Sequence, residues 1–259
     1  MISRLERLWR QVGTAISFAV FGLGGLAMTV FVFPLVNSIF RDRSRRAEIA
    51  QRMVHRAWRI FVKTMVALRV MDFEAVGADI LRREAGTLVI ANHPSLIDVV
   101  LIMSLMDRTQ CVVKPGVWKN PFMRGVIRAT NYIPNAGDSQ KMVDDCVSAL
   151  KAGNNLVIFP EGSRTVSGRA MRLQRGFAAI AIRACAPIRL VFVTCNPPTL
   201  RKGEKWYRSP PRRPVFLVRV CERVDTESFA RSEIASRAAR TLTDYIARRF
   251  EELNCHGRS

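Results

Sequence analysis

Residues 11–40 contain no charged side chain and form the most apolar stretch of the sequence. As one helix this stretch would be about 45 Å long, which exceeds the ~30 Å hydrocarbon core of a bilayer. It predicts a single tilted membrane span or, because helix-breaking residues interrupt it, a pair of short helices entering and leaving one leaflet (Gly22, Gly24, Gly25 and Pro34). A cleaved signal peptide fits poorly because the stretch is too long and no small-residue cleavage site follows. A buried core helix is the remaining interpretation.

Arginines flank both ends of the apolar stretch, more densely after it than before it (Arg4, Arg7 and Arg10; Arg41, Arg43, Arg45 and Arg46). By the positive-inside rule, the rest of the protein is expected on the cytoplasmic face of a bacterial inner membrane. Residues 47–71 then mix apolar and cationic positions at helical spacing, with Trp58 and Phe61 beside Arg59. Such a helix either lies at the lipid headgroups or packs its apolar face on the domain that follows.

Beyond Gly77 the pattern changes to short apolar strands that alternate with helices. We expect strands at 87–91, 111–113, 132–133, 156–159, 188–194 and 215–224, and helices at 94–106, 139–152, 173–184 and 228–253. This alternation predicts an α/β fold with a mixed, mostly parallel sheet covered by helices, preceded by an N-terminal membrane-associated helical segment. We expect the membrane-anchoring helices to occupy residues 1–75 and the α/β domain to occupy residues 76–259.

Composition narrows the classes that this chain of 259 residues can belong to. Its 49% hydrophobic content excludes wholesale disorder, and the six cysteines form no CxxC pair. We interpret the cysteines as reduced core residues and expect no metal site. The 41 Lys and Arg residues outnumber 21 Asp and Glu, and only seven of the cations are Lys. Arginine prefers planar anions such as phosphate, so nucleic acid, anionic lipid headgroups and a merely solvated basic surface all remain possible.

One of the three histidines, His93, stands where the strand 87–91 ends and a helix is expected to begin. Open α/β sheets place their active crevices at such strand ends. If the helix begins near Pro94 or Ser95, the Asp98 carboxylate lies in its first turn and reaches one ring nitrogen of His93. The other nitrogen is then free to act as a general base. The alternative is a simple capping box between Ser95 and Asp98, with His93 incidental.

A second polar string, from Pro160 to Thr165, follows the strand 156–159 directly. It combines a carboxylate, a glycine and an arginine in one turn (Glu161, Gly162, Ser163 and Arg164). Glycine allows a ligand to approach the backbone closely, and arginine binds phosphate or carboxylate in a fork. Lys114, elsewhere in the domain, would add positive field for an anionic substrate. The alternative is an ordinary turn with a surface ion pair.

These two strings stand 68 positions apart, and together they carry a resemblance to a known family. Asn92 to Asp98 reads NHPSLID and resembles the N-H-x-x-x-x-D motif of the glycerolipid acyltransferases. Residues 159–165 read FPEGSRT and resemble their F-P-E-G-T-R-S motif. Over roughly residues 85–195 the sequence is therefore similar to the lysophosphatidic acid (1-acylglycerol-3-phosphate) acyltransferases.

The resemblance implies that His93 is the general base, that Asp98 orients it, and that the acceptor's glycerol phosphate is bound nearby (Asn92, Lys114, Glu161, Gly162, Ser163 and Arg164). Amides near the helix start would stabilise the oxyanion, and the helix 96–106 would line a groove for the acyl chain. The donor would be an acyl carrier protein or coenzyme A thioester. Neither a cofactor nor a nucleic acid partner is implied.

The second family motif, of the type G-x-I-F-I-x-R, lacks its arginine in the corresponding stretch 129–135. Since that motif helps to bind the acceptor, the same acyl transfer to a non-phosphate lipid, such as a lyso-aminolipid or a polyketide-like lipid, is an alternative. A thioester hydrolase and a non-catalytic binder of anionic lipid or nucleic acid are the less favoured functions.

Overall fold

The computed structural model describes residues 2–135, 137–165, 171–230 and 234–256. Within these ranges the chain forms a seven-stranded sheet with the order β1-β7-β6-β2-β5-β3-β4. Neighbouring strands are parallel except β6 and β7, which form an antiparallel pair. The strands are β1 Asp72–Val76, β2 Leu88–Ala91, β3 Thr109–Val113, β4 Ile133–Pro134, β5 Asn155–Ile158, β6 Ile188–Asn196 and β7 Val215–Val224. The expectation of a mixed, mostly parallel sheet is confirmed.

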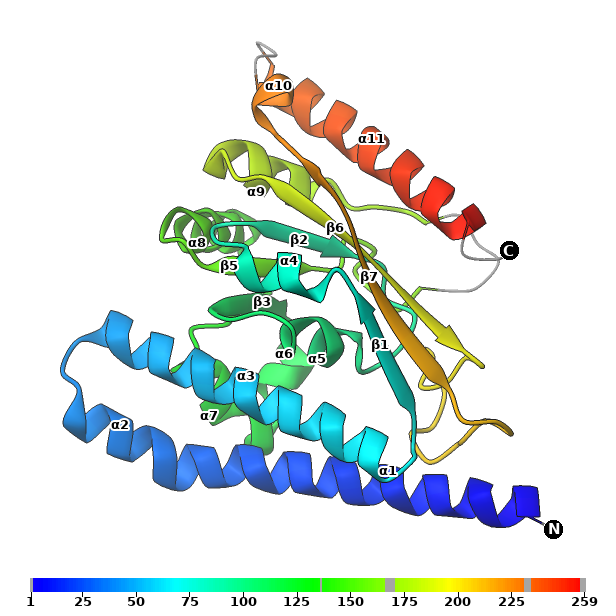
Figure 1. Cartoon of the computed structure of the whole chain (residues 1–259). Coiled ribbons are helices and arrows are strands. Elements are labelled where there is room, and N and C mark those ends of the chain that lie inside the picture. The colour runs from blue at the N-terminus through cyan, green and yellow to red at the C-terminus, as the bar shows by residue number, and fades with distance from the viewer. Residues whose placement is uncertain (1, 136, 166–170, 231–233, 257–259) are drawn as a thin grey trace.

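Helices pack on both faces of this sheet because its central strands are apolar on both sides. In β2, Leu88 and Ile90 contribute to one core cluster, while Val89 and Ala91 contribute to the other. Helices α8, α9 and α11 cover the first face, and α3, α5 and α7 cover the second (Figure 1). These helices are α3 Arg43–Ala67, α5 Asp98–Met103, α7 Pro121–Ala129, α8 Ser139–Lys151, α9 Gly176–Ala184 and α11 Ala235–His256; shorter ones are α4 Ala78–Arg83, α6 Pro115–Trp118 and α10 Glu227–Ala230.

All six expected strands are present within two residues of their predicted ends. The sequence patterns missed β1, α4, α6 and α7, which are all short. Three expected helices are wrong in extent. The helix expected at 94–106 is only α5, the one at 173–184 begins at Gly176, and the one at 228–253 is divided into α10 and α11. Since β1 pairs with β7, the sheet begins before residue 76, and the division into two domains stays a prediction.

The apolar N-terminal stretch is a continuous helical rod, so the expectation of two helices entering and leaving one leaflet is wrong. It consists of α1 Ile2–Ala27, the π-helical turn η1 Met28–Val32 and α2 Phe33–Ile39. The three glycines do not interrupt α1. Pro34 stands in the first turn of α2, directly after η1. Proline is tolerated in the first turn of a helix, and here the helical backbone continues from η1 into α2.

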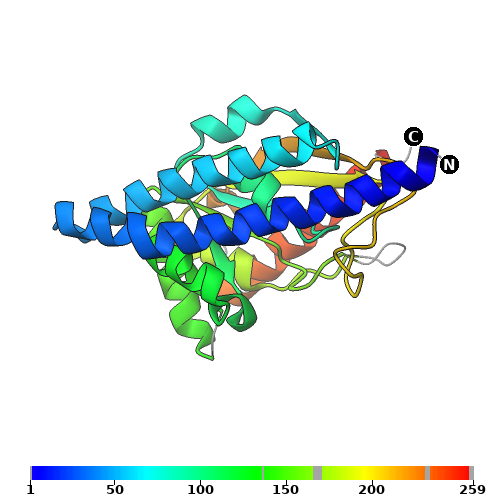
Figure 2. The same ribbon diagram turned by 90° about the horizontal axis from the view of Figure 1, so that it is seen from below.

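The rod lies across one side of the α/β domain, antiparallel to α3 (Figures 1 and 2). Near its start, the Arg10 guanidinium donates to the carbonyl oxygens of Pro210 and Pro211, at 3.1 and 2.8 Å. Near the end of α1, Gly25 lies so close to α7 that a Cβ there would be 2.8 Å from the Phe122 carbonyl oxygen. The rod is therefore attached to the domain along its length.

Helix α3 uses its apolar face for packing rather than for exposure at a membrane surface. Trp58 and Phe61 are each 5% exposed and stack against the rings of Phe18 and Phe21. Of the two interpretations of the segment 47–71, packing on the rest of the protein is the one that the structure confirms for these aromatic residues.

Candidate active site

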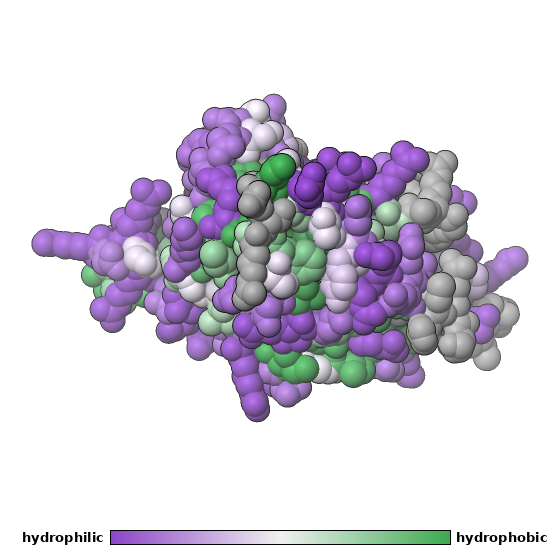
Figure 3. Space-filling view, turned by 90° about the horizontal axis from the view of Figure 1, so that it is seen from above, coloured by the Kyte–Doolittle hydropathy of each residue, from purple (hydrophilic) through white to green (hydrophobic). Residues whose placement is uncertain are grey.

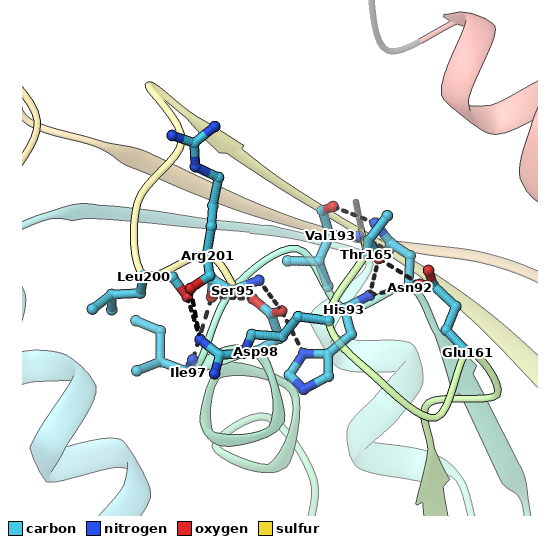
Figure 4. Close-up of polar contacts among 11 residues, drawn as sticks. Asn92, His93, Ser95, Ile97, Asp98, Glu161, Thr165, Val193, Leu200 and Arg201 are labelled. Atoms are coloured by element: carbon cyan, nitrogen blue, oxygen red, sulfur yellow. Dashed lines mark hydrogen bonds and ion pairs between the residues drawn. The ribbon is translucent and has the colours of Figure 1, made fainter. Parts of the chain in front are cut away.

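The junction between β2 and α5 holds His93 and Asp98 in direct contact. The Asp98 side chain is fully buried, and its Oδ2 atom lies 2.8 Å from His93 Nδ1. Helix α5 begins at Asp98 itself rather than near Pro94 or Ser95, so this carboxylate reaches back across a non-helical bend (Figure 4). The same carboxylate accepts hydrogen bonds from the Ser95 amide, at 2.6 Å, and from the Ser95 hydroxyl. The Ser95–Asp98 contact and the His–Asp contact, which seemed to be alternatives, are both present, although the N-cap of α5 is Ile97 and Ser95 does not cap the helix.

The other ring nitrogen of His93, Nε2, is available for chemistry. The His93 side chain is 20% exposed and stacks on Phe159, with ring centroids 4.3 Å apart. Within the described part of the chain, no polar atom contacts Nε2. A carboxylate at Nδ1 holds the proton there and leaves the lone pair on Nε2, which is the arrangement of a general base.

The turn after β5 is hydrogen-bonded to the backbone of His93. The His93 amide donates to Thr165 Oγ1 at 2.9 Å, and the Thr165 amide donates to the His93 carbonyl oxygen at 2.7 Å. Glu161 Oε1 accepts a hydrogen bond from the Thr165 hydroxyl and lies 3.4 Å from the His93 amide nitrogen. Sequence reasoning did not assign roles to Thr165 or Phe159, although both belong to the FPEGSRT string. Their position inside that string was the available signal.

Glu161 therefore contacts the strand-end loop of His93. Burial raises the pKa of Glu161 above its ordinary value, and the hydrogen bonds from Thr165 and the His93 amide oppose that rise. Gly162, beside it, has φ +66°, and a Cβ there would lie 2.5 Å from Gln174 Nε2, so this turn requires glycine. Ser163 is half-buried in the same turn.

Three polar side chains expected to bind substrate also contact the protein backbone. The Asn92 amide donates to the Val193 carbonyl oxygen and accepts from the Val193 N–H, at 2.8 and 2.7 Å, so it links β2 and β6, and its role in substrate binding stays a prediction. Arg164 Nη1 donates to two carbonyl oxygens in the loop after β6, at 3.0 and 2.9 Å. Lys114 Nζ donates to the Gly162 carbonyl oxygen at 2.6 Å.

One further expectation around α5 requires correction, and another stays a prediction. The amides of Ser95, Leu96 and Ile97 precede α5 and already donate to protein oxygens, so an oxyanion site would need amides of α5 itself, and that role stays a prediction. The expected acyl groove along 96–106 is not an open surface. The side chains of α5 from Val100 to Met103 are buried in the core, and only Leu96, before the helix, is 45% exposed.

Three of the cysteines are buried or partly buried among apolar groups. Burial raises the pKa of the Cys111, Cys146 and Cys195 thiols to about 12, so they are protonated near neutral pH. No group of three or more His, Cys, Asp or Glu side chains with the spacing of a metal site occurs in the described ranges.

Comparison with known proteins agrees with this geometry. The acyltransferase family model matches residues 72–195, which include His93, Asp98 and the turn from Glu161 to Thr165. The chain is 27% identical over 128 residues to a 1-acyl-sn-glycerol-3-phosphate acyltransferase of Cocos nucifera, covering 47% of this chain and 42% of that protein. It is 27% identical over 147 residues to one of Limnanthes alba, covering 54% of this chain and 52% of that protein. The chain thus spans about half the length of these relatives, or less.

The fold also matches a solved structure over nearly the whole chain. The crystal structure of the 1-acyl-sn-glycerophosphate (LPA) acyltransferase PlsC from Thermotoga maritima superposes with a TM-score of 0.71. The two sequences are 22% identical, and the match covers 97% of this chain and 98% of that one, N-terminal rod included. Residues 72–195 are therefore similar in sequence to the acyltransferase family, and the chain shares the fold of this solved structure.

Proposed function

We propose that this protein is a membrane-associated O-acyltransferase. It would move an acyl chain from an acyl carrier protein or coenzyme A thioester to the hydroxyl of a lysophospholipid-type acceptor such as 1-acylglycerol-3-phosphate. The observation that carries the proposal is the buried Asp98 carboxylate at 2.8 Å from His93 Nδ1, with Nε2 of the same ring directed away from this partner.

The proposed reaction needs one base and no covalent acyl-enzyme. The acceptor hydroxyl gives its proton to His93 Nε2 as its oxygen attacks the thioester carbonyl carbon. The tetrahedral intermediate then collapses, the C–S bond breaks, and the imidazolium returns the proton to the departing thiolate. Asp98 stabilises the imidazolium and fixes the ring orientation, while Thr165 and Phe159 hold the loop and the ring in place.

A non-phosphate acceptor is the second candidate, and two observations favour it. The stretch 129–135 lacks the arginine of the second family motif. In addition, Arg164 already donates to the carbonyl oxygens of Leu200 and Arg201. An acceptor phosphate would therefore bind the remaining donors of Arg164 or Lys114, whereas an uncharged acceptor would need neither.

Membrane association is supported by a stripe of exposed apolar side chains along the rod. Arg4–Ile39 is long and apolar enough to cross a membrane, and 17% of its most apolar window is buried. We define the apolar stripe by the large hydrophobic residues exposed on α1, η1 and α2: Leu5, Leu8, Trp9, Val12, Ile16, Val20, Leu23, Leu26, Val30, Phe31, Leu35 and Ile39. The face of the molecule seen in Figure 3, on the opposite side from the rod, is predominantly hydrophilic.

Because α3, α7 and the 209–211 loop hold the rod against the domain, we propose that it lies in one leaflet and does not cross. An interfacial helix of this kind buries its apolar face while its cations stay at headgroup level. The exposed arginines after the rod favour the cytoplasmic face of a bacterial inner membrane.

The test uses the full chain in detergent or vesicles, with acyl-coenzyme A and acyl carrier protein thioesters supplied separately. Thiol release is followed with and without lysophosphatidic acid, and lipid products are identified by mass spectrometry. Acceptor-dependent release with phosphatidic acid formed, lost in His93→Ala, is the expected result. Formation of an acylated product only from an uncharged lysolipid would select the second candidate. Free fatty acid without acylated acceptor would instead indicate a hydrolase, and full activity in His93→Ala would exclude His93 as the base.

A further inference from the structure

A basic cleft lies where α2 turns into α3, and no residue of the His93 site lines it. Two adjoining cavities, of about 720 and 310 Å³, share three lining residues, Arg43, Arg128 and Asn131. Arg46 lines the smaller cavity and Lys141 the larger one. We name this feature the arginine cleft and define it by Arg43, Arg46, Arg128, Asn131 and Lys141. Its volume is in the range of ordinary ligand sites.

The charges of the arginine cleft are poorly balanced by the protein. Asp145 also lines the larger cavity and pairs with Lys141 at 3.5 Å. Arg46 donates to the Asn37 side-chain oxygen at 3.5 Å. Within the described residues, Arg43 and Arg128 have no carboxylate partner within 4.0 Å. Guanidinium groups that line one cavity repel each other unless an anion lies between them. The amino end of α3 adds no free positive pole, because the Asp42 carboxylate caps it and accepts hydrogen bonds from the Ser44 and Arg45 amides.

The position of the cleft indicates which anion it would bind. Phe33 and Pro34, from the rod, line the smaller cavity, and Leu35 and Ile39 of the apolar stripe are 60% and 62% exposed on the same short helix, α2. Trp118, an aromatic residue of the kind enriched at membrane interfaces, lines the larger cavity. A ligand with a phosphate next to hydrocarbon would match both the arginines and the stripe.

We infer that the arginine cleft binds the phosphate headgroup of an anionic phospholipid of the surrounding membrane, at a site separate from the catalytic one. This inference rests on the proposed association of the apolar stripe with one leaflet. The guanidinium groups of Arg43 and Arg128 donate hydrogen bonds to the phosphate, and the acyl chains lie beside α2. Bound in this way, the lipid fixes the α2–α3 turn at headgroup depth.

The experiment compares partitioning of the full chain onto phosphatidylcholine vesicles and onto vesicles that also contain phosphatidylglycerol. The variant is Arg43→Gln/Arg128→Gln. Its matched control, Arg237→Gln/Arg240→Gln, removes two exposed arginines from α11, on the far side of the molecule from the rod (Figure 1). Each cation near an anionic surface contributes roughly fivefold to binding, so the cleft variant should lose about 25-fold of the extra affinity for anionic vesicles. The control should retain that affinity, and both should bind phosphatidylcholine vesicles like the wild type.

Equal losses in the two variants would show a diffuse charge effect and would overturn the inference, as would no loss in the cleft variant. If the wild type does not bind phosphatidylcholine vesicles, that result would instead contradict the membrane proposal. A second arm titrates glycerol 3-phosphate in the absence of vesicles by calorimetry. Tight binding there that depends on Arg43 and Arg128 would mean that the cleft takes a water-soluble phosphate ester, and the lipid assignment would be wrong.

Discussion

Two regions of this protein each bring a histidine ring to an aspartate, yet only one has the arrangement of a base. At the end of β2, His93 Nδ1 contacts the fully buried Asp98, and Nε2 has no polar partner among the described residues. On α3, His55 Nε2 lies 3.1 Å from Asp107, whose side chain is 67% exposed, and Nδ1 lies 3.0 Å from the Met103 carbonyl oxygen.

The difference shows that a His–Asp pair is defined by what its second nitrogen meets. Both nitrogens of His55 contact protein oxygens, so this ring joins α3 to the segment at the end of α5, and neither nitrogen is open to a substrate. His93 follows the carboxyl end of β2, the central strand of the sheet, and keeps its Nε2 nitrogen available. The two pairs therefore serve as matched controls for each other.

The largest effect is expected from His93→Ala compared with His55→Ala. Loss of the base should lower the acyl-transfer rate by about 10²–10⁴-fold while leaving thermal stability nearly unchanged, because a half-buried ring is removed from a loop. His55→Ala should keep most of the activity and instead lower the melting temperature. Thiol-release kinetics and thermal unfolding of both variants measure this. Equal losses of activity in His93→Ala and His55→Ala would show that the two His–Asp pairs do not differ in function.

Asp98→Asn and Asp107→Asn sharpen the same comparison. At position 98 an amide can donate to Nδ1 and favour the wrong tautomer of His93, so the rate should fall roughly 10²-fold or more. Asp107 is exposed, and breaking its contact with His55 should change the activity by less than about twofold. The measurement is the rate as a function of pH. A wild-type profile in Asp98→Asn would show that this carboxylate does not orient the base.

Gly25→Ala tests the helical layer without touching the catalytic loop. The added methyl group would lie 2.8 Å from the Phe122 carbonyl oxygen, a backbone atom of α7, so we expect a loss of about 1–3 kcal/mol in unfolding free energy. Gly24→Ala meets nothing within 4 Å and should be neutral or stabilising by up to about 1 kcal/mol. Denaturant unfolding of both variants in detergent measures these changes in the free energy of unfolding. Identical stabilities would mean that α1 does not pack on α7 as described.

The smallest effect concerns the pH dependence of stability at Glu161. Burial raises the pKa of this carboxyl in the folded state, so the folded protein binds the proton more tightly than the unfolded chain. The resulting stabilisation is complete below the unfolded pKa and is lost as the pH rises through the folded pKa. Relative to Glu161→Gln, the wild type should gain stability as the pH falls from about 7 to about 4. A difference that is flat, or that grows toward neutral pH, would contradict this sign.

The local pattern of the sequence was sufficient to predict six strands and the parallel character of the sheet. Apolar runs such as 156–159 have few structural options, and the motifs at His93 and Glu161 stood at strand ends that could be placed from sequence. The start of α5 could not be placed, because a Pro-Ser pair fits a helix start and a bend equally well, and the tertiary contacts selected the bend.

The sequence by itself placed the two polar strings that hold the candidate site residues at strand ends, and it showed that residues 11–40 contain no charged side chain. Only the tertiary structure decided how they are used, because contacts between distant segments have no local signal. The neighbouring positions of β2 and β5 bring Thr165 to the His93 backbone. The same long-range packing commits Asn92 to Val193 and buries the face of α5 expected to be a groove. It also keeps the rod straight along the domain where glycines and a proline predicted a break.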